Sequence, residues 1–542
     1  MGKKTALLFS VLLLAAFLFF YMNDFGKGVI PETFVPGTFS EEVRRAMQLQ
    51  AGALGQLDTE EVRLCFRGEE LACDRETGVW YLPVDMDSGL WEAGDFTAVG
   101  GEIDVLPLQD YTLLDKKTVV AGGQKVPFFA WKEKERMGVP VYVVFTGLPV
   151  VRVETGADLD VDTVFAGNIV FYSACSSRDW TVSSGFEAHE RGQTTRAFPK
   201  KGYRLNLITV TPTGVVNKNP QSVLGMRDSD SWIFYAIYSD GTKVRDKFNI
   251  ELWNAFGAVN TPYDVHFGTH MEYAELVVNG EYRGLYGIME PVDSRQLAIS
   301  DQEFLYKRTM GRELSTEVLD TASPEDYLSL QGMEIKGKDG YGSRTDWQRF
   351  RDFVEITEAE DPEFVRETGK LLNMENAADL WLYLQMLYGE DNIYKNMFFA
   401  FKKEAGGEKL YLVPWDVDLT WGNIYTDQKE HLYTVYDGRK AEEYLEWPFM
   451  DRVIALNAGG IRSVIEERYR ELRGDILSDG HMQKLLESCI HQVQDSGAFM
   501  RDAVRWPDSH HDGNYDEIYE FMKKRMIFLD KMIENMDEQM QD

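Results

Sequence analysis

The sequence predicts an α+β protein built in several parts, and three observations support this. Strand-like runs dominate from about residue 59 to 295, helical spacing dominates beyond about 345, and one apolar run stands at the N-terminus. The 542 residues are too many for one ordinary domain and enough for two or three. Hydrophobic residues make up 44% of the chain, which supplies sizeable cores and argues against disorder.

The N-terminal segment has the pattern of a membrane anchor. Two lysines, Lys3 and Lys4, precede an apolar run over residues 5–22, which as a helix would span about 27 Å, close to the roughly 30 Å of a bilayer core. The lysines are expected on the cytoplasmic side, which places the bulk of the chain outside the cytoplasm. Residues 1–24 are therefore predicted to be a single-pass anchor and 25–58 a linker. The alternative is a cleaved signal peptide, in which case the protein is secreted.

Residues 59–145 are predicted to form a small β-domain, because short strand-like runs such as 78–82 and 140–145 are separated by Gly and Asp turns. A spacer and a binding module fit this region equally well. The four cysteines could form disulfides outside the cytoplasm, and Cys65 and Cys73 are close enough in sequence to join one hairpin. No Cys/His cluster is evident, so a metal site would have oxygen ligands, which suits Mg²⁺ or Ca²⁺.

Residues 146–295 are predicted to form a mixed region of strands with one helix. Strands are expected at 168–172 and 203–207, and a hairpin at 273–289 turns at Asn279-Gly280. The helix is expected from Lys243 to Phe256, capped by residues 240–242 and ended by Gly257.

Residues 296–542 are predicted to be mostly helical, with one β-hairpin at 397–413 that turns at Gly406-Gly407. The expected helices lie near 346–357, 362–373, 375–389, 462–476, 480–505 and 514–537.

The charge balance narrows the classes of partner. Against 57 Lys and Arg stand 89 Asp and Glu, for a formal net charge of -32. A chain of this charge repels phosphate backbones, which argues against nucleic-acid binding. Most of these carboxylates are expected to form a solvated surface, although the excess also favours the binding of multivalent cations.

The polar motifs follow the order found in protein kinases: a strand lysine, a helix glutamate, a hinge, a catalytic Asp with an Asn five positions later, and a metal-binding Asp after a strand. The classical signatures are absent, because there is no G-x-G-x-x-G loop, no His-Arg-Asp and no Asp-Phe-Gly. The candidates are Lys200 and Lys201 on a strand, Glu251 on the helix, Glu290 after the hairpin, Asp391 with Asn396, and Asp416 with Asp418.

Most of these motifs also have an ordinary structural explanation. Lys200 and Lys201 could be a solvated strand end, and Asp391 a helix-terminal turn. The pair Asp416 and Asp418 is more specific, because residues i and i+2 of an extended segment face the same way. Two such carboxylates repel each other unless a cation lies between them, although a turn or capping role is the alternative.

Five ordered sequence blocks together resemble the CotH family of atypical, kinase-like proteins, whose members are known as secreted or spore-coat protein kinases. The resemblance covers roughly residues 140–535, and Thr194-Thr195 replaces serines of the family pattern. The blocks are Arg191 to Arg196 with Phe198 to Leu205, Leu224-Gly225 with 230–232, Val278 to Tyr286 running into Glu290, Asp391-Asn392 with Asn396, and Leu412 to Asp418 with Gly422.

The resemblance implies a bilobal fold, with a mixed β N-lobe over 146–295 and a helical C-lobe over 296–542, and it implies ATP and Mg²⁺ as cofactors. By position, Lys201 or Lys200 would hold the nucleotide phosphates, with Glu251 as ion-pair partner and Arg191 and Arg196 lining the phosphate pocket. Glu290 would lie at the hinge beside adenine, Asp391 would orient the acceptor hydroxyl, Asn396 and Asp416 would bind Mg²⁺, and Asp418 would be a second metal or supporting ligand.

These roles predict an extracytoplasmic Ser/Thr protein kinase that acts on surface, envelope or coat proteins. Two alternatives remain open at this point. One is a catalytically inactive, nucleotide-binding scaffold protein of the cell surface or spore coat. The other is a phosphotransferase that acts on a glycan.

Overall fold

The computed structural model describes residues 40–156, 163–192, 194–260, 268–309, 316, 323, 325, 332–338, 342–425 and 434–536. The predicted anchor, and the linker up to residue 39, lie outside these ranges. Within them, no helix combines the length and apolar character that a membrane crossing requires.

The N-terminal part consists mainly of β-strands and is preceded by the helix α2 (Glu41–Gly52). Its larger sheet has the order β4-β5-β9-β8-β7, with β1 on β9, and a second sheet has the order β3-β2-β6. The strands are β1 (Gly55–Gln56), β2 (Leu64–Phe66), β3 (Glu69–Glu70), β4 (Ala72–Asp74), β5 (Val79–Pro83), β6 (Phe96–Ala98), β7 (Asp104–Pro107), β8 (Lys125–Lys132) and β9 (Met137–Thr146), with the helix α3 (Lys116–Ala121) before β8.

The possible Cys65–Cys73 bridge is not formed, because all four cysteines are free. Cys65 lies in β2 and pairs with Glu70 of β3, whereas Cys73 lies in β4 and pairs with Trp80 of β5. The two thiols therefore belong to different sheets rather than to facing strands of one hairpin.

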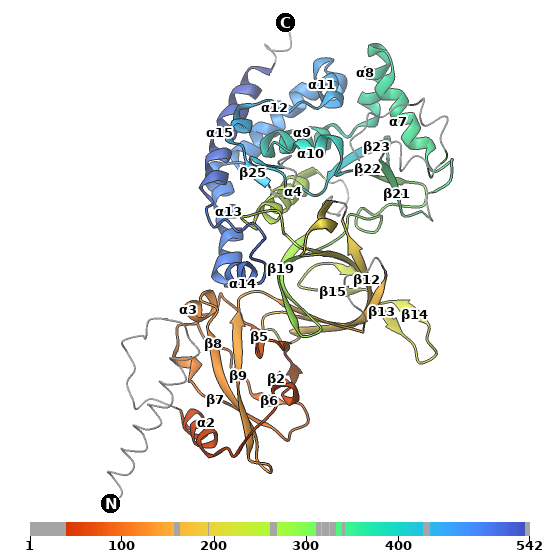
Figure 1. Cartoon of the computed structure of the whole chain (residues 1–542). Coiled ribbons are helices and arrows are strands. Elements are labelled where there is room, and N and C mark those ends of the chain that lie inside the picture. The colour runs from red at the N-terminus through yellow and green to blue at the C-terminus, as the bar shows by residue number, and fades with distance from the viewer. Residues whose placement is uncertain are drawn as a thin grey trace, which may run out of the picture.

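The middle of the chain forms a closed β-barrel, which Figure 1 shows end-on as a ring. Its eight-stranded sheet has the order β12-β11-β10-β18-β19-β17-β13-β14, and β12 also pairs with β13, which closes the ring. Apolar side chains such as Phe186, Trp232 and Tyr286 fill the interior. The strands are β10 (Val150–Thr155), β11 (Phe165–Tyr172), β12 (Thr181–Arg191), β13 (Gly202–Val210), β14 (Val216–Lys218), β17 (Ser231–Tyr235), β18 (Met271–Val278) and β19 (Glu281–Met289), with a small hairpin of β15 (Gln221–Ser222) and β16 (Asp228–Ser229).

The helix α4 (Arg245–Asn260) joins the barrel to the helical half. It begins as predicted, because Asp240 accepts hydrogen bonds from the main-chain N–H groups of Thr242 and Arg245. The predicted end at Gly257 is wrong. A glycine inside a helix costs only about 1 kcal/mol relative to alanine, so it does not by itself stop a helix.

The C-terminal half is helical around one four-stranded sheet of order β21-β20-β22-β23. The predicted helix over 480–505 is two helices, because Gly497 adopts a left-handed conformation with φ of +71° and breaks it. The elements are β20 (Phe304–Arg308), β21 (Met333–Lys336), α7 (Gln348–Glu358), α8 (Asp361–Leu371), α9 (Met374–Leu387), α10 (Glu390–Tyr394), β22 (Met397–Glu404), β23 (Gly407–Pro414), β24 (Asn423–Tyr425), β25 (Thr434–Tyr436), α11 (Pro448–Ala455), α12 (Ile461–Gly474), α13 (Asp479–Asp495), α14 (Ala498–Arg505) and α15 (Asp516–Glu534).

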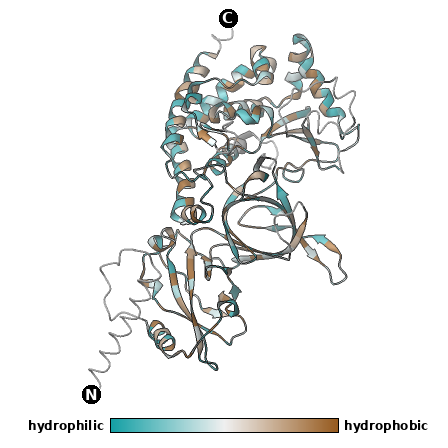
Figure 2. Cartoon of the chain, viewed as in Figure 1, coloured by the Kyte–Doolittle hydropathy of each residue, from teal (hydrophilic) through white to brown (hydrophobic). Residues whose placement is uncertain are grey.

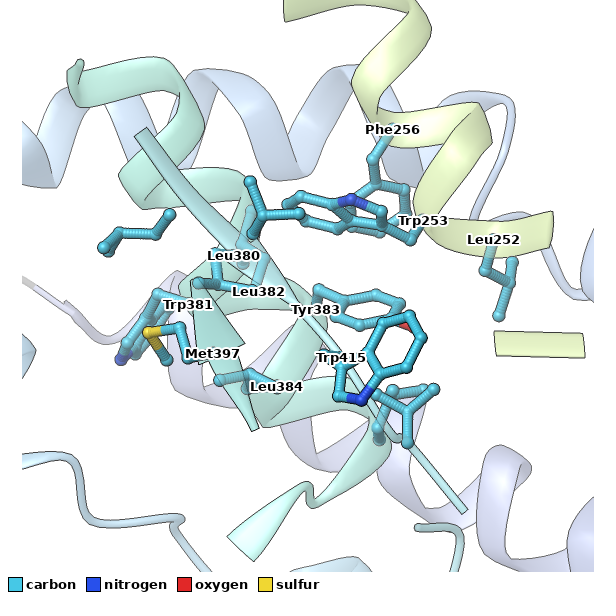
Figure 3. Close-up of a cluster of buried hydrophobic side chains, with 14 of the residues drawn as sticks. Leu252, Trp253, Phe256, Leu380, Trp381, Leu382, Tyr383, Leu384, Met397 and Trp415 are labelled. Carbon is cyan, nitrogen blue, oxygen red and sulfur yellow. The ribbon is translucent and has the colours of Figure 1, made fainter. Parts of the chain in front are cut away.

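Helix α9 is the centre of the helical core and is buried on almost every side. Figure 3 shows Trp253 and Phe256 of α4 facing Tyr383 of α9, and the ring centroids of Trp253 and Tyr383 are 5.1 Å apart. The outer helices are amphipathic: along the C-terminal helices in Figure 2, hydrophobic and hydrophilic residues alternate. Helix α14 reaches back to contact β19 of the barrel, as Figure 1 shows.

Candidate functional site

The segment that follows β23 carries the predicted carboxylates Asp416 and Asp418. Asp416 is in the left-handed region, with φ of +57°, so the chain turns sharply there as it leaves the strand. Hydrogen bonds from the side chain of Asn249 of α4 hold this turn in place. The side-chain N–H₂ of Asn249 donates to the Val417 carbonyl over 2.7 Å and to Thr420 Oγ1 over 2.8 Å, and its Oδ1 accepts from Trp421 Nε1 over 2.7 Å.

Asp391 lies in the first turn of the short helix α10, and Asn396 lies just after it. The side chains meet, because Asn396 Nδ2 donates to Asp391 Oδ2 over 2.7 Å. Lys395 is 3.1 Å from the same oxygen. Asn396 is also close to the carboxylate segment, since the Trp415 N–H donates to the Asn396 carbonyl over 2.9 Å. The structure therefore brings Asp391 and Asn396 next to the Asp416 turn.

A further carboxylate, Asp246 in the first turn of α4, joins this group from the barrel side. Its Oδ1 accepts from the Val417 N–H over 3.2 Å, and its Oδ2 is buried without a hydrogen-bond partner. Burial, with Asp418 and Asp416 nearby, raises the pKa of Asp246 well above its ordinary value. We call Asp246, Asp391, Asp416 and Asp418 the carboxylate cluster.

The pKa values of Asp418 and Asp391 also reflect the repulsion within the carboxylate cluster. Burial, followed by Asp416 and Asp391, raises the pKa of Asp418 to about 7, although Ser239 Oγ donates to this carboxylate over 3.1 Å. Burial also raises the pKa of Asp391, against the opposing effect of Lys395. Among the described residues, no hydrogen-bond donor or ion-pair partner reaches the carboxylate of Asp416. Among the described residues, Lys395 beside Asp391 is the one cation at ion-pair distance from the cluster, so four carboxylates face a single positive charge.

The residues of the carboxylate cluster suit a divalent cation such as Mg²⁺ that is also bound by substrate and water, rather than a metal coordinated by protein ligands alone. In the described ranges, no group of three or more His, Cys, Asp or Glu side chains is arranged as a ready-made metal cage. Mg²⁺ is commonly held by one or two carboxylates together with substrate phosphates and water. The unpartnered Asp416 and the adjacent Asn396 offer oxygen ligands of this kind, and Asp246 and Asp418 are close enough to share the charge. A cavity lined by Asp246, Trp415 and Asp416 adjoins them.

Of the two predicted arginines near the turn between β12 and β13, Arg191 lies at this site. The guanidinium of Arg191, at the end of β12, lies over the ring of Trp415, 5.7 Å from its centroid. Arg196 lies in the turn itself and donates to the Glu190 carbonyl over 3.3 Å. Arg191 is therefore adjacent to the residue that precedes Asp416, while Arg196 supports the shape of the turn.

The predicted ion pair of Glu251 with Lys200 or Lys201 is wrong, because each side chain has a different partner. Glu251 is 2.8 Å from Lys247, one helical turn earlier in α4. Lys200 has no exposed side-chain surface and lies 2.7 Å from Asp502 of α14. Lys200 is therefore unsuited to holding a nucleotide. Lys201 is partly exposed, donates to the Arg196 carbonyl and lies 3.5 Å from Glu190.

Glu290 follows β19 as predicted, but its polar groups are largely engaged. The N–H and the Nε–H of Arg227 donate to its carboxylate over 3.0 and 3.2 Å. Its own N–H donates to the His270 carbonyl over 2.9 Å, and its carbonyl accepts from the Thr269 hydroxyl. A contact with adenine at this residue would have to use the second lone pair of the carbonyl.

Sequence reasoning missed Asp246 and Asn249, the two α4 residues that contact the Asp416 turn. They are three residues apart, which places them on one face of the helix. That spacing was visible in the sequence, but an Asp in the first turn of a helix is ordinarily read as favouring the helix dipole. Only the packing of α4 against residues 417–421 shows that this face is part of the site.

Fold and site together define the class of protein: an α+β chain in which a closed β-barrel and a helical half meet at a carboxylate cluster. A family model described as CotH kinase protein matches residues 188–529, which is more than half of the chain. The chain belongs to the CotH kinase protein family, and membership suggests a kinase-like enzyme. No match was found among curated proteins.

Proposed function

We propose that the protein is an ATP- and Mg²⁺-dependent phosphotransferase, and specifically a Ser/Thr protein kinase that acts on exported surface, envelope or coat proteins. The observation that carries the proposal is the meeting of Asp391, Asn396 and Asp416 from separate segments beside an arginine of the barrel turn. These are the groups that phosphoryl transfer requires: carboxylates for a metal, a carboxylate for the acceptor and a cation for the phosphates.

The barrel and the helical half would correspond to the two lobes of a kinase, with the donor between them. Asp391 accepts the proton of the acceptor hydroxyl, as the hydroxyl oxygen forms its bond to the γ-phosphorus of ATP. The bond from that phosphorus to the β–γ bridging oxygen breaks, and ADP leaves. Asp416 and Asn396 would hold Mg²⁺, which when bound neutralises charge on the phosphates. Lys395 and Asn396 orient the Asp391 carboxylate.

The extracytoplasmic location is proposed from the lysine-flanked apolar run at residues 5–22. The type of acceptor is proposed from the family resemblance alone. An inactive nucleotide-binding scaffold and a glycan phosphotransferase are therefore outcomes that the following test separates from a protein kinase.

Replacing Asp416 or Asp391 is expected to abolish phosphotransfer in two different ways. Asp416→Ala removes a metal ligand and should weaken ATP binding as well as turnover. Asp391→Ala removes the group that orients the acceptor, so ATP affinity should survive while the rate falls on the order of 10²–10⁴-fold or more. The measurements are transfer from labelled ATP in Mg²⁺, with protein and glycan acceptors, and calorimetric ATP binding with Mg²⁺ or with EDTA.

The matched control is Asp495→Ala, which removes an exposed carboxylate of α13. Full transfer by both site variants would show that the site is assigned wrongly. A wild-type protein that binds ATP yet labels no acceptor would favour the scaffold function, and exclusive labelling of a glycan would replace the protein acceptor.

A further inference from the structure

Two cations lie over the indole of Trp415, the residue before Asp416. Arg191 comes from the end of β12 in the barrel, 5.7 Å from the ring centroid, and Lys307 comes from β20 in the helical half, 5.6 Å from it. The Lys307 ammonium also lies 5.7 Å from the centroid of Phe398. Two parts of the molecule that are 116 residues apart in sequence (191 and 307) thus place positive charge against one ring.

Arg191 and Lys307 form no close ion pair with any described residue. In the part of the chain that the structure describes, no carboxylate lies at ion-pair distance from Lys307 or Arg191. The nearby Glu334 is paired with Lys336 instead. Burial, with Lys336 and Arg191 nearby, lowers the pKa of Lys307 to about 8, while Glu334 and Asp416 act in the opposite direction. Placing two adjacent cations in a partly buried position is costly unless an anion joins them.

The anion that fits must also tolerate Asp416. Any anion beside Asp416 is repelled unless a cation lies between them, and a nucleotide phosphate brings such a cation because it binds as its Mg²⁺ complex. The terminal phosphate of a nucleotide has three oxygens on which charge is spread during transfer, so it can face a metal on one side and two side-chain cations on the other. Trp415 is itself held in place, because its ring is buried and its main-chain N–H donates to the Asn396 carbonyl.

We propose that Lys307, together with Arg191, binds the terminal phosphate of the donor nucleotide on the Trp415 side of Asp416. This rests on the proposed phosphotransferase function and adds Lys307, a residue of the helical half, to the site. Lys307 and Arg191 then form a clamp that spans the barrel and the helical half. The clamp is complete only when both parts are in the arrangement that the structure shows.

The test is the binding of MgATP and MgADP to the full chain and to Lys307→Met. Methionine keeps the apolar stem against Phe398 and Trp415 but removes the charge. Since a charge-assisted contact to one phosphate is lost, we expect ATP affinity to fall about 10- to 100-fold and ADP affinity to change less than about 3-fold. Lys338→Met is the matched control, because Lys338 lies over the ring of Phe304 in β20 and not over Trp415.

Each outcome decides the assignment. Unchanged ATP affinity in Lys307→Met, with normal binding by the wild type, overturns the role of Lys307 alone. Equal weakening of ATP and ADP shows that Lys307 contacts an inner phosphate and overturns the terminal position. A wild-type protein that binds no ATP contradicts the proposed function and this clamp with it. If Lys307→Met changes the melting temperature, Lys307→Gln takes its place in the test. The same difference between ATP and ADP affinity is expected for Lys307→Gln.

Discussion

Asp418 carries part of the electrostatic cost of the carboxylate cluster. It is buried, it faces Asp416, Asp391, Asp246 and Asp240, and its pKa of about 7 lies far above the roughly 3.9 of an unfolded aspartate. A raised pKa means that the folded state holds the proton more tightly than the unfolded state. This contribution to stability is complete below about pH 4 and is lost as the pH rises through about 7.

We therefore expect the melting temperature of the metal-free protein to fall between about pH 5 and pH 8, and to fall less in Asp418→Asn. Mg²⁺ should reverse part of this loss, and its stabilising effect should be larger at pH 8 than at pH 6, because a bound proton must leave before the metal enters. Differential scanning calorimetry across this range makes the measurement, with Asp495→Asn as the control. The same pH slope in Asp418→Asn and in the wild type would contradict this explanation.

The sequence predicted Asp391, Asn396, Asp416 and Asp418 because their spacing is local: five residues in one case and two in the other. Asp246 and Asn249 were missed because their contacts are with a distant segment of the chain, and the same holds for Lys307 of the proposed clamp. Lys200 was assigned to the nucleotide because its partner, Asp502, is 302 residues away. A lysine beside a second lysine on a strand gives no local sign that one of the two is buried in an ion pair.

At the scale of elements, α4 is the support on which the Asp416 turn rests. Asn249 alone makes three hydrogen bonds to residues 417–421, and it has no exposed surface. Its main-chain carbonyl also accepts from Tyr383 of α9. One residue therefore links α4, the central helix α9 and the Asp416 turn.

Asn249→Ala is expected to destabilise the protein by about 2–4 kcal/mol, because it leaves the buried indole N–H of Trp421 without a partner. It should also weaken Mg²⁺-dependent ATP binding, since the turn that carries Asp416 loses its support. Chemical denaturation and calorimetry test the two effects. Asn254→Ala, on the same helix, is the matched control, because the Asn254 side chain donates to the Thr269 carbonyl over 3.1 Å and contacts His270 Nδ1 at 3.3 Å instead of the Asp416 turn. If both variants bind MgATP equally well, α4 supports the fold and not the site.

Some boundaries of helices and strands can be predicted from the neighbouring residues alone, and others cannot. The hairpin at Asn279-Gly280 was predicted exactly where it lies, because a tight turn with two positive φ angles is specified by those two residues. The end of α4 and the break at Gly497 were not. In both cases a glycine is present, and tertiary packing decides whether the helix continues through it or stops.

At the scale of the whole molecule, Asp502 ties the C-terminal helices to the barrel. Its carboxylate accepts from Lys200 over 2.7 Å and from the Leu285 N–H over 2.8 Å, and lies 2.9 Å from His511. Burial alone would raise its pKa, but Lys200, His511 and Lys243 together hold the pKa of Asp502 below its ordinary value. This contribution to stability is present above about pH 4 and is lost as the pH falls through the lowered pKa.

Asp502→Asn should therefore cost about 3–5 kcal/mol, because it leaves Lys200 charged, buried and unpaired. The double variant Lys200→Met with Asp502→Leu should recover part of this loss, since neither partner then carries a charge. Denaturant unfolding at neutral pH measures both variants. A double variant as unstable as the single one would show that the contacts to Leu285 and His511, rather than the ion pair, carry the stabilisation.

The closure of the β-barrel has a consequence for how the site can open. In an open sheet, an edge strand can slip by two residues against its neighbour and carry its turn with it. In a closed ring, β12 is paired on both sides, with β11 and with β13, so slippage of this strand would have to be matched around the whole circumference. Arg191 therefore lies at the end of a strand that is hydrogen-bonded on both sides within a closed barrel. For the proposed nucleotide, we therefore expect entry and exit to involve movement of the barrel as one body against the helical half, and not slippage of β12.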